Sequence, residues 1–246
     1  MAATTQQSAE PLPGTRLVRF DAAERVAHWA TAALFLSLTV TGAFLYVPAL
    51  VALVGQRALV ERLHVDCGLA LPLPLVVSLA GSWGRGLRTD LRRLNRWTAE
   101  DRQWLALVLR REPVAGASVG KFNPGQKLNA AFTGGVVVVM LMTGCIMRWA
   151  YFWPLSFRTG ATFVHDLVAY CFVAVALAHI SMALAHPAAL RSMVTGVVNR
   201  AWANKHAALW AAEIGAPARP PAEPAARAGE PMPSTGEPAT GSKRVG

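Results

Sequence analysis

The chain has 246 residues, of which 53% are hydrophobic and only 15% are charged, and its mean hydropathy is +0.33. This composition is unusual for a soluble domain and favours a membrane protein. The formal net charge is +10. Membrane topology accounts for this charge, as the distribution of Lys and Arg indicates below, so a nucleic-acid-binding role need not be invoked.

Four apolar stretches are candidates for membrane-crossing helices, each of which needs roughly 20 residues to span about 30 Å of hydrocarbon. They lie at residues 28–48, 63–83, 128–149 and 164–187. Pro48 predicts the end of the first stretch. The second carries Asp66 near its start and should be kinked by Pro72 and Pro74. The sequence therefore predicts an all-α fold, a four-transmembrane-helix bundle within a membrane domain over residues 26–190.

Lys and Arg are distributed unevenly among the connections between these stretches. Three lie in residues 1–25, ten in residues 84–127 and seven after residue 190, whereas the other two connections together hold four. Because short loops rich in Lys and Arg stay in the cytoplasm, both termini are predicted to be cytoplasmic, in a multi-pass protein of the bacterial inner membrane.

The same distribution divides the parts outside the membrane. Residues 1–25 are predicted to form a cytoplasmic N-terminal segment, and residues 84–127 form a basic cytoplasmic loop. A cytoplasmic helical segment is expected over residues 191–214. Residues 215–246 are rich in Ala, Pro, Gly and Glu, which predicts a disordered tail.

Four histidines fall at two depths of the predicted bundle. His28 opens the first stretch on the inner, cytoplasmic side, whereas His64 and His165 open the second and fourth on the outer side. His179 lies fourteen residues after His165, ~21 Å further along the same helix and on the same face. The depths predict an outer pair, His64 with His165, and an inner pair, His28 with His179.

Each pair is suited to hold one b-type haem, because imidazole is a good ligand of haem iron and a helical bundle accommodates the flat macrocycle. The competing interpretation is that such histidines pack at helix ends, and this is how His186 and His206 are interpreted. Zinc is disfavoured, since two histidines leave a tetrahedral site half empty. Ionisable groups inside a membrane span are usually functional, which favours haem ligation by the two pairs.

Small residues lie near these histidines. Gly42 follows His28 by fourteen positions, and Gly68 follows His64 by four. Glycine permits close approach either of a porphyrin ring or of a neighbouring helix, and both interpretations stay open. The dipeptide Thr41-Gly42 in the first stretch recurs as Thr143-Gly144 in the third, which suggests corresponding positions.

Residues 16–214 resemble the membrane cytochrome b (gamma) subunit of respiratory formate dehydrogenases, within the diheme cytochrome b membrane-subunit group. The resemblance rests on "RFDAAERVAHW", "LHVDCG", "VGKFNPGQK", "VHDLVAYCFVAVALAH" and "VVNRAWANKHAALWAAEI", of which "GKFNPGQK" is the most specific. It implies that His28 and His179 ligate an inner haem b and that His64 and His165 ligate an outer one. The pairing derived from depth agrees with it.

The resemblance also implies that Asn123, Gly125 and Gln126 bind a quinone beside the inner haem. Amide side chains can hydrogen-bond a quinone carbonyl, and glycine permits close approach. Without the resemblance, "NPG" is better explained as a turn before a helix. Lys121 and Lys127 are expected to anchor the helix end at the lipid headgroups.

The implied activity is that of an electron-transfer subunit of a formate:quinone oxidoreductase in anaerobic respiration, with no catalytic side chains of its own. A periplasm-facing molybdenum or tungsten catalytic (alpha) subunit and an iron-sulfur (beta) subunit would be its partners, and electrons would pass through the outer and inner haems to quinone. The alternatives are a cytochrome b subunit of another dehydrogenase, hydrogenase or reductase, a stand-alone b561-type quinol oxidoreductase, and a haem-free membrane anchor or assembly factor.

Overall fold

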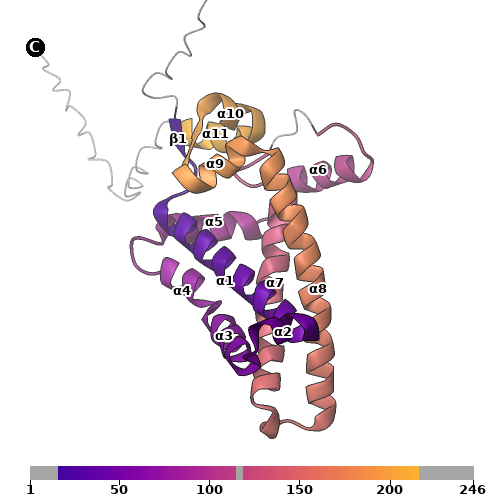
Figure 1. Cartoon of the computed structure of the whole chain (residues 1–246). Helices are drawn as coiled ribbons and strands as arrows, with labels where there is room; N and C mark the ends of the chain where they lie inside the picture. Colours follow the sequence, from indigo (N-terminus) through magenta and orange to yellow (C-terminus); the bar gives the residue numbers. More distant parts are fainter. Residues whose placement is uncertain (1–15, 115–118, 216–246) are drawn as a thin grey trace, which may run out of the picture. The chain divides into compact units, whose positions relative to one another are not determined.

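The computed structural model describes residues 16–114 and 119–215, which are predominantly helical (Figure 1). Apart from Gly215, the predicted disordered tail lies outside the described residues. Most of the predicted N-terminal segment and part of the basic loop lie outside them as well.

The described elements alternate between long helices and groups of short ones. In chain order they are β1 (Arg16–Val18), α1 (Ala22–Tyr46), α2 (Pro48–Val54), α3 (Arg57–Ala70), α4 (Leu73–Ser78), α5 (Arg85–Asn95), α6 (Ala99–Leu109), α7 (Pro124–Arg148), η1 (Ala150–Phe152), α8 (Leu155–Ala185), α9 (Pro187–Thr195), β2 (Val197–Asn199), α10 (Arg200–His206) and α11 (Ala208–Gly215).

Within the described part of the chain, α1, α7 and α8 are the helices long and apolar enough to cross a membrane. Helix α1 ends at Tyr46, just before Pro48, as predicted. Helix α7 begins four residues before the predicted third stretch, at Pro124, and α8 begins nine residues before the fourth, at Leu155. With 31 residues, α8 is about 46 Å long, which exceeds the hydrocarbon thickness of a bilayer.

The second predicted stretch forms two helices rather than one kinked helix. Helix α3 ends at Ala70 and α4 begins at Leu73. Proline lacks a backbone N–H and its ring clashes with the preceding turn, so Pro72 and Pro74 interrupt the helix. The Leu71 N–H closes α3 by donating to the Gly68 carbonyl at 3.3 Å. Both short helices pack against α1, as Figure 1 shows.

Helices α1 and α8 run past each other with aromatic contacts between them. Phe35 of α1 stacks on Phe172 of α8 with ring centroids 4.2 Å apart and planes 22° apart. Nearer the end of α1, Tyr46 meets Tyr170 edge-on at 5.9 Å. Helix α8 also packs along α7. Many apolar side chains of α8, such as Leu177, face outward, as expected for a helix in contact with lipid.

A two-stranded antiparallel sheet, absent from the sequence prediction, joins the start of the membrane domain to its end. Strand β1 pairs with β2 in the register Arg16↔Asn199, Leu17↔Val198 and Val18↔Val197. Beneath it lies a small core formed with α10 and α11, consisting of Val198, Ala203, Ala207, Trp210 and Ala211. The chain therefore enters α1 and leaves α9 at the same place.

Candidate functional site

Four histidines form two pairs between helices. His28 of α1 lies beside His179 of α8, with ring centroids 6.4 Å apart and ring planes at 54°. His64 of α3 lies beside His165 of α8, with centroids 6.3 Å apart and planes at 63°. These are the two pairs that the sequence places at common depths. That they ligate haem stays a prediction.

The two pairs belong to a layered contact between α1 and α8. Positions 28, 35 and 42 of α1 and positions 165, 172 and 179 of α8 are each seven residues apart, which keeps each set on one helix face. The stack of Phe35 on Phe172 therefore lies midway between the two histidine pairs. Along α8 the two pairs are ~21 Å apart, because fourteen residues each rise 1.5 Å.

The separation within each pair fits one metal ion between two imidazoles. One metal ion bound to both rings, with metal–nitrogen bonds of about 2 Å and about 1.1 Å from each nitrogen to its ring centre, would put the ring centres up to about 6.2 Å apart. A direct N–H···N hydrogen bond of about 2.9 Å would bring them to about 5.1 Å. The 6.3 Å and 6.4 Å separations match the first arrangement. The donor set, two imidazoles in an apolar helix interface, also suits haem iron.

Within the described part of the chain, each pair consists of two histidines alone. Among residues 16–114 and 119–215, no three His, Cys, Asp or Glu side chains gather as a metal site. The other histidines are used locally. The His186 Nδ1 lies 2.8 Å from the Met182 carbonyl oxygen one turn earlier, and His206 stacks on Trp202 with centroids 5.1 Å apart. Both contacts agree with the packing role predicted for them.

The repeated Thr-Gly dipeptide lies against the outer pair. The Thr41 Oγ1 is 2.9 Å from the His64 Nδ1, and the Thr143 Oγ1 is 2.8 Å from the His165 Nδ1. The sequence shows the repeat but does not show that the two hydroxyls lie against these histidines. The occurrence of Thr-Gly in both α1 and α7 is the sequence signal that points to these two threonines.

Asn123 and Gln126 close the N-terminus of α7. The Asn123 side chain accepts a hydrogen bond from the Gln126 N–H at 2.9 Å, and the Gln126 side chain accepts one from the Asn123 N–H at 3.0 Å. This reciprocal capping box is the turn before a helix that the residues alone favoured. Gly125 and Gln126 are exposed. Because capping uses the amide oxygens, the two side-chain NH₂ groups are left as donors, and quinone binding stays a prediction.

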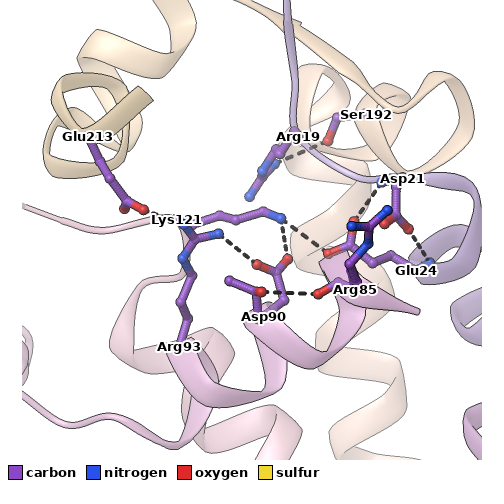
Figure 2. Close-up of polar contacts among 10 residues, drawn as sticks. Arg19, Asp21, Glu24, Arg85, Asp90, Arg93, Lys121, Ser192 and Glu213 are labelled. Atoms are coloured by element: carbon purple, nitrogen blue, oxygen red, sulfur yellow. Dashed lines mark hydrogen bonds and ion pairs between the residues drawn. The ribbon is translucent and has the colours of Figure 1, made fainter. Parts of the chain in front are cut away.

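Lys121 is buried, so the expectation that it lies at the headgroups is wrong. Its Nζ donates to the Glu24 Oε1 at 3.2 Å and also binds the Asp90 carboxylate (Figure 2). The Arg93 guanidinium also binds the Asp90 carboxylate, at 3.0 Å. Glu24 lies 97 residues earlier in the chain. Local sequence gives no sign of such a distant partner.

Lys127 is buried as well, and the same expectation is wrong for it. Its Nζ donates to the Asp101 carboxylate at 2.6 Å and to the Arg96 carbonyl at 2.9 Å. Burial raises the pKa of Asp101, but hydrogen bonds from Lys127 and from Thr98 lower it by more, so its pKa lies below the ordinary value. This ion pair ties the start of α7 to α6.

The Lys121 contacts place the loop before α7 one helical turn of α1 away from His28. Glu24 and His28 are four residues apart on α1, one helical turn, or ~6 Å along the axis. Phe122 packs on Phe20 just before α1, with ring centroids 6.2 Å apart. The loop and His28 therefore lie at the same end of α1.

Arg19 holds this end of α1 to the segment after α8. Its guanidinium donates to the buried Ser192 hydroxyl at 3.1 Å and lies 4.6 Å from the Trp202 ring centre (Figure 2 shows the Ser192 contact). Burial lowers the Arg19 pKa to about 10, against the opposing effect of Asp90. The side chain is still protonated at neutral pH.

Comparison with known proteins agrees with these features. The family described as "Prokaryotic cytochrome b561" matches residues 19–196. The formate dehydrogenase cytochrome b556(fdo) subunit of Escherichia coli K12 is 29% identical over 209 residues, covering 80% of this chain and 93% of the relative.

Two further relatives have similar names. The nitrate-inducible formate dehydrogenase cytochrome b556(Fdn) subunit of Escherichia coli K12 is 27% identical, covering 80% of this chain and 91% of the relative. The formate dehydrogenase cytochrome b556 subunit of Haemophilus influenzae is 26% identical, covering 80% of this chain and 82% of the relative. The family match spans most of the chain and includes all four paired histidines and three apolar membrane-length helices. This chain is a membrane protein of the prokaryotic cytochrome b561 family.

Proposed function

We propose that the chain is the membrane-anchoring diheme cytochrome b subunit of a respiratory formate dehydrogenase. The observation that carries the proposal is the presence of two histidine pairs, each with ring centres 6.3–6.4 Å apart, at two levels of α8. Family membership implies b-type haem. The formate dehydrogenase assignment is supported by the names of the relatives that match over 80% of the chain.

Each histidine has one role in this proposal. His28 and His179 hold the inner haem, and His64 and His165 hold the outer one. Bound haem b supplies a one-electron carrier at each pair. The protein's own contribution is to fix the separation of the two pairs, ~21 Å along α8, and to surround them with apolar helices. The stacked Phe35 and Phe172 keep α1 and α8 in register between the pairs.

The proposed electron path runs from outside to inside. A periplasm-facing catalytic subunit with molybdenum or tungsten oxidises formate and passes electrons through an iron-sulfur subunit to the outer pair. Haem held by His28 and His179 would supply the two electrons that, together with two protons, reduce quinone to quinol. Asn123, Gly125 and Gln126 are the proposed quinone contacts, which is supported by the NH₂ groups that capping leaves as donors and by the closeness of this loop to the His28 turn.

The proposed topology has four crossings, made by α1, by α3 together with α4, by α7 and by α8, within residues 26–190, and both termini are cytoplasmic. Two features support it. The pairing of β1 with β2 brings the start of α1 and the end of α9 together, which requires an even number of crossings between them. The basic residues of 84–127 and those after residue 190 favour the cytoplasmic side.

Haem content and spectra of single-histidine variants test the central claim. The purified chain should contain two haems b with the sharp alpha band of reduced low-spin haem. His64→Ala and His165→Ala should each lose the same haem, and His28→Ala and His179→Ala should lose the other. His186→Ala is the matched control and should keep both. A chain without haem in a haem-supplied preparation, or equal loss of both haems from every variant, would rule out the proposed sites.

The electron donor is tested on the assembled complex. Purification through a tag on this chain should bring down an iron-sulfur subunit and a molybdenum- or tungsten-containing subunit, and formate should reduce both haems. Haem reduction by hydrogen or by another donor, without reduction by formate, would assign the cytochrome to a different respiratory enzyme.

A further inference from the structure

Two threonine hydroxyls lie against the outer histidine pair in the same way. Thr41 reaches from α1 to the His64 ring of α3, with 2.9 Å between Oγ1 and Nδ1. Thr143 reaches from α7 to the His165 ring of α8, with 2.8 Å between the same two atoms. The contact is thus repeated across two different helix pairs, once for each histidine of the outer pair.

Each hydroxyl is also bonded within its own helix. The Thr41 Oγ1 donates to the Ser37 carbonyl at 2.7 Å, and the Thr143 Oγ1 donates to the Val139 carbonyl at 2.8 Å. A carbonyl can only accept, and a hydroxyl has one hydrogen to give. Each threonine can therefore make both hydrogen bonds at once in only one way. The imidazole Nδ1–H donates to Oγ1, and the hydroxyl donates to the carbonyl.

This arrangement selects one tautomer of each ring. With the proton on Nδ1, the lone pair of Nε2 is free to bind a metal. The acceptor also limits rotation of the ring about its side-chain bonds. Metal-binding histidines generally donate their second N–H to such an acceptor, which fixes ring orientation and makes the ligand a better electron donor.

The glycine after each threonine lies against the same histidine ring. A Cβ on Gly42 would lie 3.4 Å from the His64 Cε1, and one on Gly144 would lie 3.6 Å from the His165 Cε1. Each ring therefore packs directly on the glycine next to its acceptor, at a distance where a Cβ would make ordinary van der Waals contact.

The inner pair differs from the outer pair in this respect. In the described residues, no side-chain hydroxyl is hydrogen-bonded to the ring of His28 or His179. The same molecule thus contains an internal comparison, because a change at the threonines should affect one histidine pair and spare the other.

We propose that Thr41 and Thr143 are positioning residues for the outer haem, each accepting the Nδ1–H of its histidine so that Nε2 faces the iron. This inference rests on the proposed function, since it requires haem at the outer pair. Loss of the acceptor makes the imidazole a weaker donor and its orientation less defined. The affinity of the outer site for haem should fall by roughly 10- to 100-fold, and the reduction potential of any haem retained there should rise.

The test uses the full chain purified with haem, and it compares Thr41→Val and Thr143→Val with Thr41→Ser and Thr143→Ser. The valine variants should lose outer haem or raise its potential in a redox titration, whereas serine, which keeps the hydroxyl, should restore both properties. Thr39→Val is the matched control, because Thr39 donates to the Phe35 carbonyl on the same helix and, in the described residues, is hydrogen-bonded to no histidine ring. A His28→Ala background, expected to carry only the outer haem, allows that haem to be titrated alone.

Three results would overturn the inference. In the first, both valine variants keep the outer haem content and potential of the wild type. In the second, the valine variants lose inner and outer haem equally. In the third, the serine variants fail to restore the outer haem. If valine prevents folding, Thr143→Ala removes the hydroxyl without adding bulk, and a wild-type outer haem in that variant refutes the proposal. Absence of haem from the wild-type chain is a distinct result and contradicts the proposed function itself.

Discussion

Replacement of Lys121 by Met should destabilise the chain strongly. Lys121, Glu24 and Asp90 are each less than a tenth exposed, and the Lys121 ammonium contacts both carboxylates. Methionine keeps much of the side-chain volume but leaves the carboxylates facing each other without the cation between them. Removing one partner of a buried ion pair costs about 3–5 kcal/mol, because Glu24 must then either stay charged and desolvated without a cation or take up a proton.

The expected change is large enough to measure by equilibrium unfolding in mild detergent titrated with a denaturing detergent. A loss of about 3–5 kcal/mol corresponds to a fall of roughly a hundred- to several-thousand-fold in the folding equilibrium constant. Adding Glu24→Gln to Lys121→Met should recover much of it, because Arg93 still compensates Asp90 at 3.0 Å. The exposed Lys205, replaced by Met, gives the control.

The double-mutant cycle separates this explanation from simple loss of packing. If the cost comes from the unpaired carboxylate, Glu24→Gln is less harmful, or even favourable, in the Lys121→Met background. An unfolding midpoint for Lys121→Met equal to that of Lys205→Met would show that water solvates the cluster. Failure of Glu24→Gln to recover stability would refute the electrostatic explanation.

Three further predictions concern other parts of the chain. Gly196→Ala should lower the free energy of unfolding by about 2 kcal/mol or more in the same assay, because its φ is +84° and a Cβ would lie 2.6 Å from the Phe20 carbonyl oxygen. Gly81→Ala is the control: its φ is +54° but a Cβ would meet open space, so only the cost of the backbone conformation should appear. The lowered pKa of Asp101 stabilises the folded chain at pH values above the pKa of Asp in the unfolded chain, about 3.9, and this contribution should vanish as pH falls through the folded-state pKa. Asp101→Asn should abolish that part of the pH dependence. An unchanged dependence of unfolding free energy on pH in this variant would contradict the prediction. Asn123→Asp keeps the oxygen that caps α7 but lacks the NH₂ donor. Quinone reduction should therefore fall while stability and haem reduction are kept. Normal quinone turnover in this variant would count against a hydrogen bond from Asn123 to quinone.

The histidine pairs could be predicted because their positions follow from simple helix geometry. A spacing of fourteen residues fixes both the depth and the face of His165 and His179 on one helix, whatever surrounds them. The same reasoning identified Pro48 as the end of α1. It also located the disturbance at Pro72 and Pro74, but it predicted a kink where the structure has two separate helices.

The interactions that sequence reasoning missed depend on distant residues. Lys121 meets Glu24 across 97 positions and Asp90 across 31, and no local pattern distinguishes such a lysine from one that extends to the headgroups. The roles of Thr41 and Thr143 likewise depend on which helix packs beside each one. Their repetition was visible in the sequence, but the geometry of the contact was not.

The pairing of β1 with β2 has a consequence for biosynthesis. Arg16 is among the first described residues to leave the ribosome, yet its partner Asn199 is made 183 residues later, after every proposed membrane helix. Contacts between such distant positions form late, because the intervening chain must first be arranged. Closure of the sheet therefore marks a chain whose synthesis has passed every proposed membrane helix, and a prematurely ended chain would leave β1 with its pairing groups free.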